Sequence, residues 1–247
     1  MSAGGTDQRP VLFCDADGNL FPSEGPAFLA SSEVANSMLA AVGSSRRYKP
    51  EELRRATLGR NFRDTARGLL RAEQRELTPA ELEEWVEREK LAVTERLMNE
   101  LAPRPEVNCA LELLRRQFRL AVVTSSAESR LAASLSATGL DRYFPAEVRF
   151  SAEDSLSEPR SKPDPAVYRL ALSRLGVAVD RALAIEDSPP GVQAASAAGL
   201  AVVGNTAFAP TEEREHRRAE LIELGAFAVV DSWSRAQQLA CAWSTSR

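Results

Sequence analysis

The sequence Val-Leu-Phe-Cys-Asp-Ala-Asp-Gly-Asn-Leu occupies residues 11–20, close to the start of the chain. Its four apolar residues predict a short buried strand that ends directly on Asp15 and Asp17. Two carboxylates at the exit of a buried strand repel each other and are expensive to desolvate, and a divalent cation relieves both penalties. Because side chains alternate in an extended segment, one carboxylate can act as a nucleophile while the other takes a different task. Gly18 then allows the backbone to turn sharply.

Apolar runs recur along the rest of the chain. After residues 11–14 they lie at 119–123, 182–185, 200–203 and 226–230. Helical patterns separate them, at 106–117, 127–138, 164–175 and 189–198. Because the runs lack polar alternation and are joined by helices, they predict a parallel sheet covered on both faces. The expected fold class is therefore α/β, with a doubly wound, Rossmann-like parallel sheet as its core.

The stretch between residues 26 and 101 has a different composition. It is rich in Glu, Arg, Leu and Ala at helical spacing and has little strand signal. Turn residues bound it on both sides, with Phe-Pro-Ser-Glu-Gly-Pro at 21–26 and Ala-Pro-Arg-Pro at 102–105. We therefore expect residues 22–105 to form a small helical domain with its hinges, inserted into a core of residues 1–21 and 106–247. The alternative is a continuous helical extension of the core.

The composition limits the partners and the compartment. A net charge of −4 over 247 residues gives no electrostatic argument for a nucleic acid or an acidic membrane surface. No apolar run approaches the about 20 residues that span a bilayer, and the first residues lack the pattern of a signal peptide. The three cysteines are widely separated and do not suggest a disulfide framework. We therefore expect a cytoplasmic protein whose partner is a small molecule.

Polar residues follow the apolar runs at the points where ligands bind in a doubly wound sheet, outside the carboxyl ends of the strands. The run at 119–123 leads into Thr124, Ser125 and Ser126. Their hydroxyls and backbone N–H groups suit a phosphate, or simply cap the following helix. The run at 182–185 ends on a second carboxylate pair, Glu186 and Asp187.

Lysine and histidine are scarce, which makes their positions informative. Lysine occurs only at positions 49, 90 and 162, and histidine only at position 216. Lys162 precedes a proline, which favours extended backbone, and its side chain could reach across the strand ends. His216 is the single histidine and lies in a charged run, so the chain offers almost no histidine for a Ser-His-Asp triad or a His-ligated zinc site. Two acidic pairs, a lysine and a hydroxyl cradle instead suit phosphoryl transfer, and oxygen ligands favour Mg²⁺.

Together these residues resemble the motifs of the haloacid dehalogenase (HAD) superfamily of hydrolases, in the subclass with a helical cap of the first type. That subclass includes phosphoglycolate phosphatase and β-phosphoglucomutase. Four segments match its motifs in order, namely Asp15-Ala-Asp-Gly-Asn19, Val-Val-Thr124, Lys162-Pro-Asp-Pro and Ile-Glu186-Asp187-Ser-Pro-Pro-Gly191. The resemblance covers essentially the whole chain, and the helical insert would be the cap.

The resemblance implies a Mg²⁺-dependent phosphatase that hydrolyses a small phosphate monoester. Asp15 would be the nucleophile and would form an aspartyl-phosphate intermediate. Asp17 would be the general acid for the leaving group and then the base that activates water. Dehalogenating relatives need no acid at this position and phosphonate-cleaving relatives lack the second aspartate, so Asp17 favours phosphate-ester chemistry. Asn19 departs from the pattern, since the family's first motif usually ends in Thr or Val.

The resemblance also implies a set of ligands for the metal and the phosphate. The metal ligands would be Asp15, the backbone carbonyl of Asp17, Asp187 and, nearby or through a water, Glu186. The groups that hold the phosphoryl oxygens would be Thr124, the backbone of Ser125, and Lys162. Together Mg²⁺ and Lys162 would let an anionic carboxylate approach an anionic phosphate.

Two other functions fit the same family. A sugar phosphomutase similar to β-phosphoglucomutase would carry a histidine in the place of Ala27, and its absence favours a phosphatase. A catalytically idle member that acts as a binding subunit would not need to keep the set Asp15, Asp17, Lys162 and Asp187.

Substrate choice in related caps lies in a helix–loop–helix tip that contains glycine. The matching segment here is Thr-Leu-Gly-Arg-Asn-Phe-Arg-Asp at residues 57–64. It is either a turn with solvated arginines, or a segment in which Arg60, Asn61 or Arg63 contacts the part of the substrate distal to the phosphate. Arginines there would favour a second anionic group or several hydroxyls, as in a sugar phosphate or a phosphorylated small acid.

Overall fold

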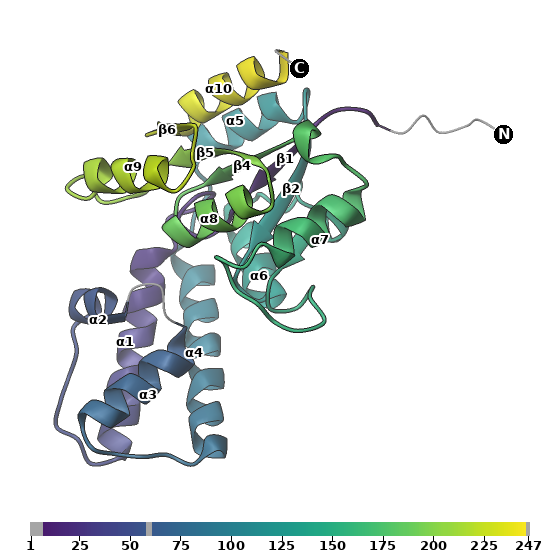
Figure 1. Cartoon of the computed structure of the whole chain (residues 1–247). Helices are drawn as coiled ribbons and strands as arrows, with labels where there is room; N and C mark the ends of the chain where they lie inside the picture. Colours follow the sequence, from purple (N-terminus) through teal and green to yellow (C-terminus); the bar gives the residue numbers. More distant parts are fainter. Residues whose placement is uncertain (1–6, 58–60, 246–247) are drawn as a thin grey trace. The chain divides into compact units, whose positions relative to one another are not determined.

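The computed structural model describes residues 7–57 and 61–245 of the chain. The chain divides into two compact units, one formed by residues 1–22 and 102–247 and the other by residues 23–101 (Figure 1). The first unit holds the sheet, and the second is helical in its described part. That the second unit acts as a cap stays a prediction.

Six parallel strands form a single sheet in the described part of the first unit, in the order β3-β2-β1-β4-β5-β6. They are β1 (Val11–Cys14), β2 (Arg119–Thr124), β3 (Arg149–Ser151), β4 (Ala182–Glu186), β5 (Ala201–Asn205) and β6 (Ala228–Val230). The central strand β1 pairs with β2 and β4, and Cys14 lies opposite Val122 and Ile185. Because all strands run in the same direction, their carboxyl ends meet at one edge. This arrangement confirms the expected α/β, doubly wound parallel sheet.

Helices cover both faces of this sheet. They are α5 (Pro105–Leu114), α6 (Glu128–Thr138), α7 (Ala166–Leu175), α8 (Pro189–Ala197), α9 (Arg214–Glu223) and α10 (Trp233–Thr245), with short 3₁₀ turns at Ala146–Val148 and Val179–Arg181. Helices α7, α8 and α9 lie over one face, while α5 packs on α10 over the other (Figure 1). Since side chains alternate along a strand, Val11 and Phe13 enter the apolar core beneath α7 and α8.

The second unit consists of α1 (Glu24–Ala41), α2 (Pro50–Thr57), α3 (Phe62–Ala72) and α4 (Pro79–Glu100) in its described part. A capping box of Thr78 and Glu81 starts α4, with Pro79 in its first turn. Helices α1 and α4 lie side by side (Figure 1), and Arg96 of α4 donates to Glu33 of α1 at 2.9 Å. The unit has its own apolar core, made of Ala35, Met38, Leu39, Leu53, Ala66, Leu69, Leu70 and Leu82.

The structure departs from the sequence-based expectation at one strand. The other strands begin and end within two residues of the expected apolar runs. Strand β3 has three residues, Arg149–Ser151, and was not expected because so short a segment carries no apolar run. In residues 7–57 and 61–245, no helix combines the length and apolarity that crossing a membrane would require.

Candidate active site

Asp15 lies directly after β1, at the carboxyl edge of the sheet. Its backbone N–H donates to the carbonyl of Ile185 at 3.0 Å, which continues the pairing of β1 with β4 by one residue. The side chain is buried, and this desolvation raises the pKa of the Asp15 carboxyl to about 7. The Lys162 ammonium opposes the shift, whereas the negative charges of Glu186 and Asp17 reinforce it.

Lys162 joins the two acidic pairs from a loop that precedes α7. Its Nζ donates to Asp15 Oδ1 at 2.5 Å, to Glu186 Oε1 at 2.6 Å and to the carbonyl of Val123 at 2.9 Å. The side chain is only 3% exposed, and the three acceptors match the three donors of its ammonium group. Burial disfavours the charged form, but Asp15 and Glu186 outweigh it and raise the pKa of Lys162.

The second acidic pair follows β4. Glu186 is fully buried, and its Oε1 also accepts a hydrogen bond from the Tyr168 hydroxyl. Within the described residues its Oε2 has no hydrogen-bond partner, and a Cβ on Gly191 would lie 1.9 Å from it. A Cβ on Gly18 would likewise lie 2.3 Å from Asp187 Oδ2. The two glycines therefore leave the space that the carboxylates occupy.

The arrangement of carboxylates fits a hard divalent cation. One ligand atom from each of Asp15, Glu186 and Asp187 can be chosen so that all lie within 4.8 Å of one another, and all three residues are buried. Lys162 brings a single positive charge to this cluster, and buried carboxylates without compensation are strongly unfavourable. An all-oxygen donor set suits Mg²⁺. The side chain of Asp17 is not part of this group, and a contribution from its backbone carbonyl stays a prediction.

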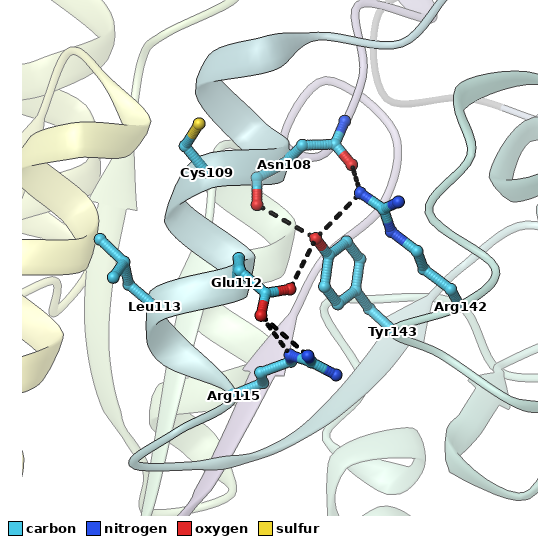
Figure 2. A pocket seen from close by; sticks show the side chains of 7 residues that line it. All are labelled: Asn108, Cys109, Glu112, Leu113, Arg115, Arg142 and Tyr143. Atoms are coloured by element: carbon cyan, nitrogen blue, oxygen red, sulfur yellow. Dashed lines mark hydrogen bonds and ion pairs between the residues drawn. The ribbon is translucent and has the colours of Figure 1, made fainter.

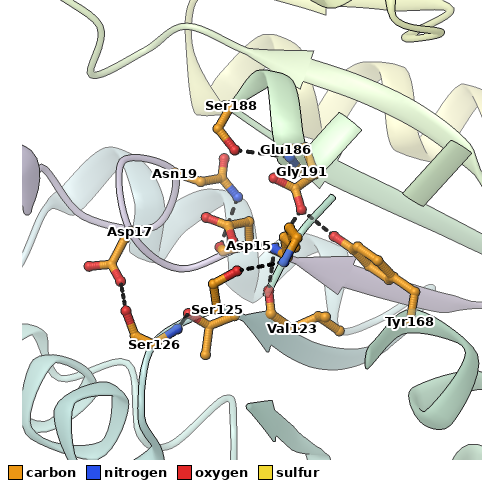
Figure 3. Close-up of polar contacts among 12 residues, drawn as sticks. Asp15, Asp17, Asn19, Val123, Ser125, Ser126, Tyr168, Glu186, Ser188 and Gly191 are labelled. Atoms are coloured by element: carbon orange, nitrogen blue, oxygen red, sulfur yellow. Dashed lines mark hydrogen bonds and ion pairs between the residues drawn. The ribbon is translucent and has the colours of Figure 1, made fainter. Parts of the chain in front are cut away.

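Asp17 directs its carboxylate toward different neighbours (Figure 3). Its Oδ2 accepts a hydrogen bond from the Ser126 hydroxyl at 2.6 Å. Its Oδ1 accepts one from Arg130 Nη2 at 3.2 Å. The side chain is 26% exposed, whereas that of Asp15 is 9% exposed. The two aspartates of the first motif thus lie in distinct environments, which allows them distinct chemical tasks.

The hydroxyl residues after β2 line the same edge. Thr124 is buried and its Oγ1 accepts from the backbone N–H of Ser126 at 3.0 Å, while Ser125 Oγ accepts from the backbone N–H of Lys162 at 3.2 Å. The N-cap residue of α6 is Ala127, which makes no side-chain cap. These hydroxyls therefore do not cap α6, and their role as phosphate ligands stays a prediction.

Two residues of this site were not identified from the sequence. Tyr168 on α7 donates to Glu186, and its ring lies 5.3 Å from Lys162 Nζ. Arg130 on α6 pairs with Asp17. Both come from helices, whose rotation the strand-end pattern does not reveal. A search of the sequence for polar residues one or two helical turns after Ser126 and Lys162 could have found both.

The candidate specificity residues lie in the helical unit. Arg60 lies outside the described residues. Asn61 is the N-cap of α3, where its Oδ1 accepts from the backbone N–H of Asp64 at 2.9 Å. Arg63 pairs with Glu83 of α4, with Nη2 2.9 Å from Oε1. Asn61 and Arg63 thus have partners in their own unit, and their contact with substrate stays a prediction.

A surface pocket of about 600 Å³ lies elsewhere on the sheet unit (Figure 2). It is lined by Asn108, Cys109, Glu112, Leu113, Arg115, Arg142 and Tyr143. Its arginines have local partners, because Arg142 donates to the side-chain oxygen of Asn108 at 2.6 Å and Arg115 pairs with Glu112 at 2.8 Å. No residue of the carboxylate cluster lines this pocket, so it is separate from the candidate site.

Comparisons with known proteins bear on the family and the fold of the chain. A family model described as haloacid dehalogenase-like hydrolase matches residues 11–199. The phosphorylated carbohydrates phosphatase of Thermotoga maritima is 30% identical over 223 residues, which cover 89% of this chain and 93% of that protein. Protein CbbY of Cereibacter sphaeroides is 30% identical over 231 residues, covering 90% and 96%. The solved structure of a putative beta-phosphoglucomutase from Thermotoga maritima is 27% identical with a TM-score of 0.70, covering 94% of this chain and 99% of that one.

Proposed function

Because the chain belongs to the haloacid dehalogenase-like hydrolase family, we propose that it is a Mg²⁺-dependent phosphatase of a small phosphate monoester. The substrate would be a sugar phosphate or a phosphorylated small acid. The observation that carries the proposal is the buried cluster in which Lys162 binds Asp15 and Glu186 beside Asp187. The phosphatase of Thermotoga maritima, named for phosphorylated carbohydrates, supports the substrate class.

In the first step Asp15 attacks the substrate. One oxygen of its carboxylate forms a bond to phosphorus while the bond from phosphorus to the ester oxygen breaks, which gives an aspartyl-phosphate. Mg²⁺, held by Asp15, Asp187 and the backbone carbonyl of Asp17 with Glu186 nearby, would supply the positive charge that brings two anions together. The Lys162 ammonium adds a fixed positive charge at Asp15, and the buried Glu186 holds that ammonium in place.

Proton transfer falls to Asp17. Its protonated form donates to the departing ester oxygen, and the resulting carboxylate accepts a proton from the water that attacks the aspartyl-phosphate. That attack breaks the bond between phosphorus and Asp15 and releases inorganic phosphate. Ser126 and Arg130 hold the Asp17 carboxylate through both of its oxygens. Thr124 and the backbone of Ser125 would hold phosphoryl oxygens during both steps.

The proposal is tested by phosphate release. Purified protein is incubated with p-nitrophenyl phosphate and with a panel of sugar and small-acid phosphates, in the presence of Mg²⁺ or EDTA. We expect release that requires Mg²⁺ and disappears in the Asp15→Asn and Asp17→Asn variants, while the exposed Asp141→Asn serves as a matched control. No release from any ester, or release that persists in Asp15→Asn, would overturn the proposal.

A mutase is the second candidate, because the similar structure from Thermotoga maritima is described as a putative beta-phosphoglucomutase. The same panel separates the two functions. A mutase would convert glucose 1-phosphate to glucose 6-phosphate and would release much less inorganic phosphate than the glucose 1-phosphate it consumes. Ala27 stands where such mutases carry histidine, and we therefore expect phosphate release.

A further inference from the structure

Asn19 is a fully buried polar residue to which the mechanism above gives no task. Its Nδ2 donates to the backbone carbonyl of Asp15 at 2.9 Å and to that of Ile185 at 3.2 Å. The carbonyl of Ile185 also accepts the backbone N–H of Asp15. A single carboxamide thus joins the carboxyl end of β1 to the carboxyl end of β4. Figure 3 shows Asn19 beside Asp15.

The other atoms of Asn19 reach further elements. Its Oδ1 accepts from Nδ2 of Asn205 at 2.8 Å, and Asn205 is the buried last residue of β5. Its backbone carbonyl accepts from the indole N–H of Trp233, the first residue of α10, at 2.8 Å. Both donors and the acceptor of the carboxamide are therefore satisfied. Asn19 connects three neighbouring strands at the edge where the site lies.

These bonds act on the backbone that carries the carboxylate cluster. Asp15 is one member of the cluster. Ile185 lies two residues before Asp187, which is another member. Carboxylates whose ligand atoms lie within 4.8 Å of one another repel, and Lys162 contacts Asp15 and Glu186, so a fixed backbone helps to keep Asp187 at that separation. A threonine hydroxyl offers one donor and could not bind both carbonyls, whereas a carboxamide offers two.

We propose that Asn19 is a positioning residue that sets the separation of the Asp15 and Asp187 backbones and thereby the affinity of the cluster for a divalent cation. The inference rests on the proposed function only in taking the cluster to be the Mg²⁺ site. Asn205 supports Asn19 from β5, since its Nδ2 fixes the orientation of the carboxamide. Removal of the two donors of Asn19 takes away the side-chain link between the carbonyls of Asp15 and Ile185, and the bond from the Asp15 N–H to the Ile185 carbonyl remains.

The test compares Mg²⁺ binding by isothermal titration calorimetry in four variants and the wild type. Residues that do not bind a metal themselves but orient its ligands typically contribute about 10–100-fold to metal affinity. We expect a loss in that range for Asn19→Leu, a smaller loss for Asn19→Thr, and the smallest for Asn205→Ser. Thr138→Val is the matched control, because the buried hydroxyl of Thr138 donates to carbonyls of its own helix, at 2.7 and 3.2 Å. We expect wild-type Mg²⁺ affinity in that variant.

A second measurement separates positioning from simple loss of stability. At high Mg²⁺ concentration the hydrolysis of p-nitrophenyl phosphate by Asn19→Thr should return toward the wild-type rate, whereas Asp15→Asn should not recover. Wild-type Mg²⁺ affinity in folded Asn19→Leu and Asn19→Thr would overturn the inference, as would an equal loss in Thr138→Val. Wild-type protein that binds Mg²⁺ but hydrolyses no ester would overturn only the proposed function. Wild-type protein that binds no Mg²⁺ would overturn both.

Discussion

At the scale of single residues, the site depends on buried charges that compensate one another. Asp15, Glu186 and Lys162 are all buried, and the ammonium lies within 2.6 Å of both carboxylates. An isolated buried charge is very unfavourable, whereas a buried pair with further hydrogen bonds can be close to neutral in its effect on stability. Lys162 meets this condition because the Val123 carbonyl takes its third donor. The same contacts hold the lysine at the place where we propose that a phosphate binds.

This balance predicts the effect of removing the ammonium. Lys162→Met keeps much of the apolar stem but leaves Asp15 and Glu186 buried without their cation. We expect the free energy of unfolding in EDTA to fall by about 3–5 kcal/mol, as for other broken buried ion pairs. Urea denaturation measures it, with Lys90→Met in the helical unit as the control. A Lys162→Met variant as stable as Lys90→Met would show that the charges compensate in another way.

The burial of Asp15 predicts a dependence of stability on pH. Its pKa is about 7 in the folded chain against an ordinary value of 3.8, so between these values the folded state holds a proton that the unfolded state has released. The contribution of Asp15 to stability is therefore complete below pH 3.8 and is lost as the pH rises through about 7. The slope is at most about 1.4 kcal/mol per pH unit.

Urea denaturation in EDTA between about pH 5 and pH 8 tests this dependence. Asp15→Asn removes the titrating group, so the stability of the wild type relative to this variant should fall as the pH rises. A difference that stays constant or rises with pH would contradict the expected direction. Saturating Mg²⁺ should oppose the fall, since the cation favours the ionised carboxylate.

At the scale of elements, glycines determine how closely α8 and the first motif approach the carboxylates. Gly191 lies in the first turn of α8, where a Cβ would collide with Glu186 Oε2. Gly25 lies in the first turn of α1, where a Cβ would meet nothing within 4 Å. The two residues occupy similar helical positions and differ in their surroundings, which makes them a matched pair.

Replacing each of these glycines by alanine should therefore have opposite effects. Gly191→Ala should lower the free energy of unfolding by about 1–3 kcal/mol, because Glu186 must move within a packed site. Gly25→Ala should raise it by up to about 1 kcal/mol, since alanine is the better helix former. Thermal and urea denaturation measure both. Equal effects of the two substitutions would mean that helix propensity alone determines the change in the free energy of unfolding.

The sequence predicts the central strands and part of the site, and the reason lies in how the elements are formed. The apolar runs of β1, β2 and β4 identified the central strands, and the rule that ligands bind at carboxyl strand ends then brought Asp15, Asp17 and Glu186 to one edge. Strand β3 was missed because its pairing with β2 is made by the backbone, which any residues can supply. Tyr168 and Arg130 were missed for a related reason. Their positions depend on how α7 and α6 pack on the sheet, and that packing is set by contacts far apart in the sequence.

At the scale of the whole molecule, the chain consists of two units with separate apolar cores. The strands of the sheet all come from residues 1–22 and 102–247 in the described part of the chain. The carboxylate cluster and Lys162 also come from these residues. The helical unit contributes Asn61 and Arg63, the two described residues that we expect to select the substrate. Folding and metal binding should therefore be separable from substrate choice.

Excision of the helical unit tests this separation directly. A short Gly-Ser linker replaces residues 23–101, and circular dichroism, thermal denaturation and phosphate release are measured with and without Mg²⁺. Because loop closure depends only weakly on loop length, we expect the shortened chain to fold. Mg²⁺ should raise its Tm as in the full chain, while its preference among phosphate esters should fall toward equal rates. A chain that fails to fold would show that the sheet unit needs the insert, and one that keeps its selectivity would locate substrate choice in the sheet unit itself.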